Sequence, residues 1–164
     1  MSRQILLMDK ARINRALKRI AIQVWESLGD QDIVIVGLNE RGYATAKLLF
    51  EYLTKLVKPE NMELYKYDVK NLAHNKMMPN CSEKNVLIVD DVIFSGKTMF
   101  DALTAICSVG DPAKVEVATL IDRGHRRYPI QADLIGLRVP TKFGEHIEAM
   151  IKADIPDQVI LFKN

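Results

Sequence analysis

The chain has 164 residues, and its 23 basic and 21 acidic side chains leave a formal net charge of only +2. This length suits one domain that buries roughly 68–70% of its unfolded surface, and so small a charge gives no argument for nucleic-acid binding. The apolar run within residues 1–9 is too short for a signal peptide, and no segment approaches the length of a membrane span. The cysteines, Cys81 and Cys107, lack metal-ligand spacing, which predicts a reduced cytoplasmic protein.

Apolar residues recur with helical spacing in some segments and in continuous runs in others. Asp9 can cap a helix in which Ile13 and Leu17 fall on one side, whereas the run after residue 85 predicts a buried strand. Helices and strands alternate along the chain, which is typical of a parallel α/β sheet. In chain order we expect a helix over 9–28, a strand over 32–38, a turn over 39–42, a helix to about residue 57 that Pro59 ends, a strand over 62–68, a long loop over 69–84, a strand over 86–91, a helix over 98–108, a strand over 115–121, a basic loop over 123–130, and strands over 132–139 and 158–163.

Two adjacent acids, Asp90 and Asp91, stand where the strand over 86–91 ends, and the loop 95–98 leads from there into a helix. In an open parallel sheet, ligands bind beyond the carboxyl ends of the strands. The first N–H groups of a helix lack intrahelical partners and suit a phosphate, which Gly96 lets the backbone approach. Carboxylates repel a phosphate, so the acids fit sugar hydroxyls or a Mg²⁺ ion better. The order of strand, acid pair, loop and helix therefore predicts a sugar-phosphate site.

The motif has other interpretations. A Walker A loop needs a glycine five positions before Gly96, where Asp91 stands, so the Gly-Lys-Thr sequence does not complete one. The acid pair could also be a solvated strand end, or a metal site of the phosphorylated-aspartate kind, although neither needs the loop that follows. A second strand-to-helix loop, residues 37–42, has glycines at both ends and should open on the same edge of the sheet; it suits an anion or is simply a turn that caps a helix.

The segment 86–98 resembles the phosphoribosyl-pyrophosphate (PRPP) motif of type I phosphoribosyltransferases, and residues 40–42 resemble their pyrophosphate-binding loop. The segment 120–133, the first helix and residues 136–142 resemble the PyrR family of pyrimidine-operon attenuation regulators, which are also uracil phosphoribosyltransferases. The resemblance implies a single α/β domain, residues 1–164, with a parallel sheet and a small hood over the active site. It also implies these roles: Asp90 and Asp91 for the ribose hydroxyls; Ser95, Gly96, Lys97 and Thr98 for the 5′-phosphate; Glu40, Arg41 and Gly42 for pyrophosphate; Phe94, Ile121, Asp122 and Arg123 for the base; Asp90, Asp91 and Arg41 as catalytic residues; and Mg²⁺ as the cofactor, held by PRPP with Asp122 close to it.

Two positions bear on the substrate. Purine-salvage members usually carry an aspartate as proton acceptor where Phe94 stands, so the ring favours uracil, unless Phe94 only fills the core. Residues 69–84 replace the flexible hood loop of the family. In place of the arginine that such hoods often bring to the pyrophosphate, this region offers only lysines and a histidine, which lack bidentate geometry. These cations are Lys66, Lys70, His74 and Lys76.

The first helix carries a basic stripe opposite Ile13 and Leu17, within about 120° at 100° per residue. It can bind RNA phosphates or be a solvated helix face, and Ile22 departs from the polar residue that the family often has there. Its cations are Arg12, Arg15, Lys18 and Arg19. We expect transfer from PRPP to uracil, giving UMP. The alternatives are an mRNA-leader-binding regulator with little catalysis, or transfer to another nucleobase. The resemblance implies a homodimer or homotetramer, and nothing suggests a membrane partner.

Overall fold

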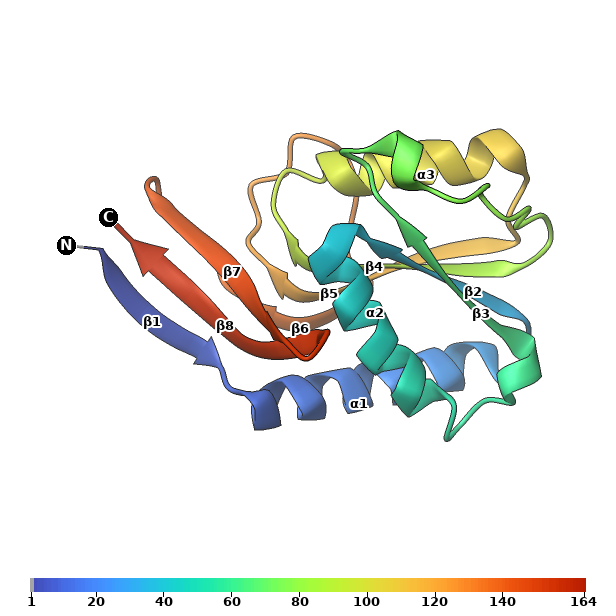
Figure 1. Cartoon of the computed structure of the whole chain (residues 1–164), viewed down its shortest axis with the longest axis horizontal. Coiled ribbons are helices and arrows are strands. Elements are labelled where there is room, and N and C mark those ends of the chain that lie inside the picture. The colour runs from blue at the N-terminus through green and yellow to red at the C-terminus, as the bar shows by residue number, and fades with distance from the viewer. Residues whose placement is uncertain (1) are drawn as a thin grey trace.

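The computed structural model describes residues 2–164 and contains a parallel sheet with helices on both faces (Figure 1). The strand order is β3-β2-β4-β5-β6, and every neighbouring pair is parallel. The predicted α/β fold with a parallel sheet is therefore confirmed. The strands are β2 (Ile33–Leu38), β3 (Met62–Tyr67), β4 (Asn85–Ile93), β5 (Lys114–Asp122) and β6 (Leu134–Arg138), and the helices are α1 (Lys10–Leu28), α2 (Asn39–Leu53) and α3 (Lys97–Val109).

The central strands are apolar throughout because both faces of the sheet are covered. Successive side chains of β2 point to opposite faces: Ile33 and Ile35 pack in the core beneath α1 and α2, whereas Val34 and Val36 pack in the core beneath α3. α1 begins where the Asp9 carboxylate accepts a hydrogen bond from the Arg12 amide at 2.8 Å, as the sequence predicts.

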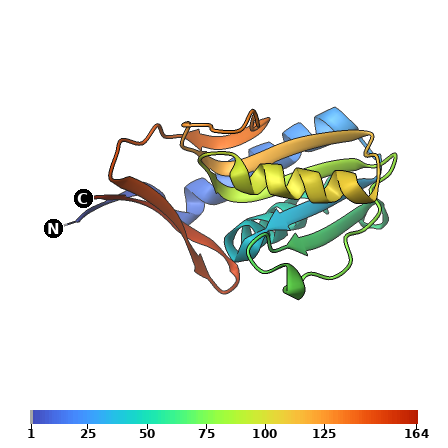
Figure 2. The same ribbon diagram turned by 90° about the horizontal axis from the view of Figure 1, so that it is seen from above.

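A second, antiparallel sheet lies beyond one end of the parallel sheet (Figures 1 and 2). It has the order β1-β8-β7 and joins the two ends of the chain, with Arg3 opposite Lys163. Of its strands, only the last was predicted, and it begins three residues earlier than expected. Ile147 and Ala149 of β7 are buried against the core beneath α1 and α2. The strands are β1 (Arg3–Met8), β7 (Glu145–Lys152) and β8 (Ile155–Lys163).

Two predicted boundaries near the site are wrong. β4 continues to Ile93, so the acids Asp90 and Asp91 lie within the strand and not at its end; Val92 and Ile93 still pair with β5. α2 begins at Asn39 and ends at Leu53, so residues 40–42 form the first helical turn and not a loop.

The segment 69–84 has little regular structure apart from the 3₁₀ turn η2 (Leu72–His74), and another such turn, η1 (Pro59–Asn61), precedes β3. Asn75 fixes the start of the segment, because its side chain accepts from the Asp68 amide and donates to the Asp68 carbonyl. Both cysteines are free. Within residues 2–164, no helix is long and apolar enough to cross a membrane.

Candidate active site

A cleft of about 570 Å³ opens at the carboxyl ends of β2 and β4, where the sequence predicts the ligand site. One wall comes from β7 of the antiparallel sheet through Ile147, and another from the start of the 69–84 segment through Lys70. Asp68 also lines the cleft, and the sequence analysis gave neither Ile147 nor Asp68 a role in the site. The predicted residues that line the cleft are Glu40, Arg41, Asp90, Asp91, Phe94, Thr98 and Arg123.

The acid pair, Asp90 and Asp91, is almost completely buried, with exposed fractions of 7% and 9%. The Asp91 amide donates to Asp90 Oδ1 at 2.8 Å, and Thr119 Oγ1 donates to the Asp91 carbonyl at 3.0 Å. Burial and the nearby Asp91 carboxylate raise the pKa of Asp90 well above its ordinary value, which Lys70 offsets only in part. Two carboxyl groups held this close are suited to bind neighbouring hydroxyls of a sugar.

The raised pKa of Asp90 predicts a pH-dependent stability. At pH values above about 4, the Asp90 carboxyl stays protonated in the folded protein, whereas the same carboxyl is ionised in the unfolded chain. The free energy of unfolding therefore falls as the pH rises above about 4. Asp90→Asn cannot ionise, so its free energy of unfolding should exceed that of the wild type at pH 7 and match it more closely at pH 4. Urea unfolding of both proteins from pH 4 to 7 checks this, and a constant difference would contradict it.

The first turn of α2 packs directly against the acid pair. A Cβ on Gly42 would lie 2.9 Å from Asp90 Oδ1, so only glycine allows this approach. The turn is tight, with Asn39 at a φ of 56°, and the Asn39 side chain accepts a hydrogen bond from the Val69 amide. The helix therefore presents its N-terminal end, where an anion is stabilised, beside Asp90.

Arg41 of this turn and Lys66 of β3 each form an ion pair with an acid. Arg41 Nη2 lies 3.5 Å from Glu148 Oε2 on β7, and Lys66 forms an ion pair with Glu40. His146 Nε2 also lies 3.6 Å from Glu148. An anion that binds Arg41 must therefore compete with the Glu148 carboxylate.

Glu148→Gln should tighten binding of pyrophosphate, because it removes the negative charge that competes for Arg41. Both side chains are partly exposed, which limits the expected decrease in the Kd for pyrophosphate to about two- to fivefold. Calorimetric titration with pyrophosphate measures this. Glu26→Gln makes the same charge change at an exposed position of α1 and should leave the Kd unchanged; an equal decrease in both variants would contradict a local effect.

The 95–98 loop forms a smaller pocket of about 220 Å³ next to Asp90. Gly96 has a φ of +85° and precedes the first residue of α3, a conformation that glycine adopts without strain. Ser95 Oγ accepts from the Lys97 amide at 3.2 Å, which shapes the loop. The structure thus brings all four predicted loop residues to one side of the acid pair, with residues 40–42 on another.

A third pocket of about 440 Å³ lies between Phe94 and residues 141–145. The Phe94 ring is 44% exposed, so it does not fill the core, and the Arg123 guanidinium stacks on it at 4.2 Å. Arg123 also donates to Thr141 Oγ1 and to the Glu145 carbonyl. The sequence analysis missed Thr141 and its neighbours, because no local pattern links them to Phe94.

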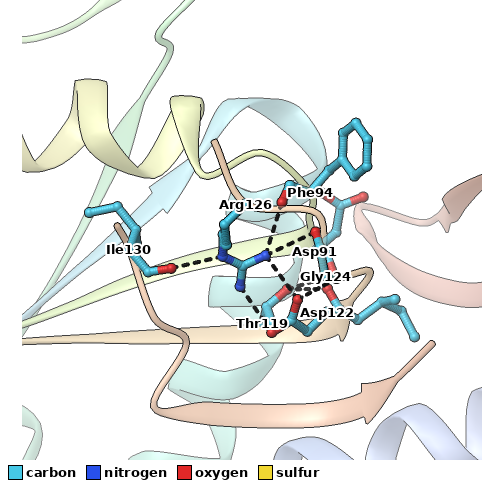
Figure 3. A network of polar contacts seen from close by, with 8 residues as sticks. Asp91, Phe94, Thr119, Asp122, Gly124, Arg126 and Ile130 are labelled. Atoms are coloured by element: carbon cyan, nitrogen blue, oxygen red, sulfur yellow. Dashed lines mark hydrogen bonds and ion pairs between the residues drawn. The ribbon is translucent and has the colours of Figure 1, made fainter. Parts of the chain in front are cut away.

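The resemblance implies that Ile121 and Asp122 contact the base largely through backbone groups, and the side chains of both residues are directed elsewhere. Ile121 is completely buried in the core. Asp122 accepts two hydrogen bonds from Arg126, each at 2.9 Å, and a third from the Gly124 amide (Figure 3). Both carboxylate oxygens are therefore occupied, which leaves the predicted proximity of Asp122 to Mg²⁺ with little support.

A Mg²⁺ ion fits this site only if the substrate supplies most of its ligands. Within residues 2–164, no group of three or more histidine, cysteine or acidic side chains could hold a metal. Mg²⁺ commonly keeps several waters and binds through one or two carboxylates plus substrate phosphates. The acid pair offers those carboxylates inside the cleft.

The predicted RNA-binding cations all lie on the exposed surface of α1, but three have contacts of their own. Arg12 donates to the Leu7 carbonyl, and Arg19 donates to the carbonyls of Ile135 and Gly136. Lys18 lies 5.4 Å from the centre of the Tyr52 ring. These contacts fix the side chains without neutralising their charge, so the stripe stays positive.

Comparison with known proteins agrees with this geometry. The family model described as phosphoribosyl transferase domain matches residues 7–153. The solved structure of a hypoxanthine-guanine phosphoribosyltransferase from Bacillus anthracis superposes with a TM-score of 0.75 at 18% identity, covering 97% of this chain and 99% of that one. A hypoxanthine phosphoribosyltransferase from Staphylococcus aureus gives a TM-score of 0.71 at 19% identity, with 85% and 80% covered. At this identity the structures show the fold alone. The chain belongs to the phosphoribosyltransferase family.

Curated relatives refine this assignment. The bifunctional protein PyrR of Enterococcus faecalis is 38% identical over 170 residues, which cover 96% of both chains. The bifunctional protein PyrR of Clostridium kluyveri is 37% identical, with 92% of both chains covered. The predicted resemblance to type I phosphoribosyltransferases of the PyrR kind is therefore confirmed.

Proposed function

We propose that the protein transfers the ribose 5-phosphate group of PRPP to uracil, giving UMP and pyrophosphate, in the cytoplasm. The observation that carries this proposal is the position of the acid pair, which is buried between the first turn of α2 and the 95–98 loop. Two anion-binding helix ends flank one pair of carboxyl groups, which matches a pentose with a phosphate at one end and a pyrophosphate at the other.

In the proposed reaction, a ring nitrogen of uracil attacks the anomeric carbon of PRPP and the bond to the pyrophosphate oxygen breaks, with inversion; the proton of that nitrogen passes to the departing pyrophosphate. Positive charge develops on the ribose ring and negative charge on the leaving group. Asp90 and Asp91 orient the ribose hydroxyls and stabilise the cationic ring, while Arg41 donates to the pyrophosphate. When bound, Mg²⁺ offsets charge on the pyrophosphate; the pyrophosphate oxygens and the acid pair would hold it. The protein acts mainly by positioning and electrostatics.

The base is assigned from the chemistry of Phe94. Its exposed ring, stacked on Arg123, offers a flat surface to a base but cannot accept a proton. Purine-salvage phosphoribosyltransferases usually carry a proton-accepting aspartate at this position, so Phe94 favours uracil. Incubation of the protein with PRPP, Mg²⁺ and a panel of radiolabelled bases tests the assignment. We expect product from uracil; product from hypoxanthine or guanine alone would contradict it.

The resemblance to the PyrR family of attenuation regulators, whose name the curated relatives carry, supports RNA binding as a second proposed function. The exposed cations of α1 would contact phosphates of a pyrimidine-operon leader, presented by a dimer or tetramer. About four phosphate contacts would give a log–log salt slope near −3 for single-stranded RNA. Filter binding of wild type and of Arg15→Glu at several salt concentrations tests this, because Arg15 lies on the stripe and outside the cleft. Binding that does not depend on salt would contradict it.

The residues 69–84 are proposed to close over the cleft as a hood loop. Lys70 already lines the cleft, and Lys66, His74 and Lys76 line an adjoining pocket of about 310 Å³ beneath this segment. Together with β7 on the other side, the segment would exclude water from the reacting groups.

A further inference from the structure

The backbone that enters the 95–98 loop is held from one side by the basic loop, residues 123–130. Three consecutive carbonyl oxygens of this backbone accept hydrogen bonds, and all of the donors belong to the basic loop. The contacts are Arg123 N to Ile93 O at 2.9 Å, Arg126 Nη1 to Phe94 O at 2.9 Å, and Arg127 N and Tyr128 N to Ser95 O at 2.9 and 3.1 Å.

These contacts fix where the neighbouring N–H groups point. In a planar trans peptide, the N–H points away from the C=O of the same peptide unit. Because the carbonyls of Phe94 and Ser95 face the basic loop, the N–H groups of Ser95 and Gly96 face away from it. Neither N–H donates to another group in the part of the chain that the structure describes. Successive free N–H groups of this kind form an anion-binding concavity, and these two residues line the pocket beside Asp90.

Arg126 is the only side chain among these donors, and its own orientation is fixed. Four of its five N–H donors are used: Nε binds Ile130 O at 2.7 Å, Nη1 binds Phe94 O and Asp122 Oδ1 at 2.9 Å, and Nη2 binds Asp122 Oδ2 at 2.9 Å (Figure 3). The side chains of Arg126 and Asp122 are 19% and 11% exposed. This bidentate pair holds the guanidinium plane against the Phe94 carbonyl.

The aliphatic part of the Arg126 side chain also packs against the loop, at Gly96. Its Cδ lies 3.4 Å from the point where a Cβ on Gly96 would stand. Gly96 has a positive φ, so this part of the side chain packs against the residue whose conformation turns the chain into α3. Arg126 thus contacts both the Phe94 carbonyl, just before the loop, and the loop at Gly96, without lining the pocket itself.

We infer that Arg126 is a positioning residue for the 5′-phosphate of the substrate, acting through the Phe94 carbonyl, and that Asp122 serves to orient Arg126. This inference rests on the proposed function, since it takes the ligand of the loop to be a sugar 5-phosphate. It assigns the basic loop a role in phosphate binding in addition to its place beside the base.

The test is direct binding of two probes, ribose 5-phosphate and pyrophosphate, to Arg126→Gln by calorimetry. Loss of a fixed hydrogen bond from a charged donor, and of the loop geometry it maintains, should raise the Kd for ribose 5-phosphate about tenfold or more. The Kd for pyrophosphate should change less than about twofold, because Arg41 and residues 40–42 are untouched. Arg126→Lys should not restore the affinity, since lysine has no planar fork to hold Asp122 and Phe94 together.

Arg138→Gln is the matched control: it removes the same charge from an exposed side chain at the end of β6 and should bind both probes like the wild type. Should Arg126→Gln fail to fold, Asp122→Asn keeps Arg126 but weakens its pairing, and should show a smaller loss of the same selectivity. An unchanged Kd for ribose 5-phosphate, or an equal loss for both probes, would overturn the inference. Wild-type protein that binds ribose 5-phosphate but makes no UMP would reject uracil transfer alone, whereas wild type that does not bind it would reject both.

Discussion

Asp91→Asn should lower kcat/KM for UMP formation by about 10²–10³-fold, which is the usual cost of removing one group that stabilises charge in the transition state. The substitution keeps the shape of the side chain and removes the negative charge that we propose to face the ribose. The substitution also removes the negative charge beside Asp90 that raises the pKa of Asp90. The folded protein should therefore be no less stable than the wild type.

Initial rates with uracil and PRPP, together with the urea midpoint, measure the two effects of Asp91→Asn separately. Asp30→Asn makes the same chemical change at an exposed position after α1 and should affect neither quantity. Near-normal turnover in Asp91→Asn would contradict the role of the acid pair. If turnover fell only because the variant was less stable, Asp91 would have a structural role and not a catalytic one.

Gly42→Ala should reduce both stability and activity, because its Cβ has no room. The added atom would lie 2.9 Å from Asp90 Oδ1 and 3.0 Å from the Val89 carbonyl, so the start of α2 must move away from β4. We expect the free energy of unfolding to fall by about 1–3 kcal/mol, as for other insertions into packed sites. The same displacement moves Arg41 from the pyrophosphate, and a misplacement of about 1 Å can cost 10²-fold in rate.

Gly29→Ala separates these two effects. Gly29 has a φ of +61° at the end of α1, with nothing within 4 Å of an added Cβ, so alanine there costs stability through backbone strain alone. This variant should lose stability and keep its kcat/KM, whereas Gly42→Ala should lose both. Normal kcat/KM in Gly42→Ala would show that the position of the first turn of α2 does not matter for catalysis.

The parallel sheet could be predicted because its strands are coded locally. The apolar runs in β2 and β4 reflect burial on both faces, and the acids at 90 and 91 mark the end that binds ligands. β1 and β7 escaped prediction for a physical reason. Each is stabilised by pairing with β8, a partner from the far end of the chain or across a turn, and only alternate residues such as Ile147 and Ala149 are buried.

The site itself could be predicted only in part. The residues from Asp90 to Thr98 belong to one strand-loop-helix segment, so their order alone predicts that they line one site. The contacts of Arg126 with Phe94 and of Glu148 with Arg41 join segments more than 30 residues apart, so no spacing in the sequence reveals them. The direction of the Asp122 side chain depends on Arg126, which is only four residues further on, but both lie where β5 gives way to an irregular loop, so no helical or strand spacing predicts their pairing.

The most direct test of the account is a crystal structure of the protein soaked with PRPP and Mg²⁺. We expect the ribose hydroxyls within hydrogen-bonding distance of Asp90 and Asp91, the 5′-phosphate on the amides of residues 95–98, and the pyrophosphate beside Arg41. A 5′-phosphate bound elsewhere, or a ribose with no contact to the acid pair, would contradict the central claim.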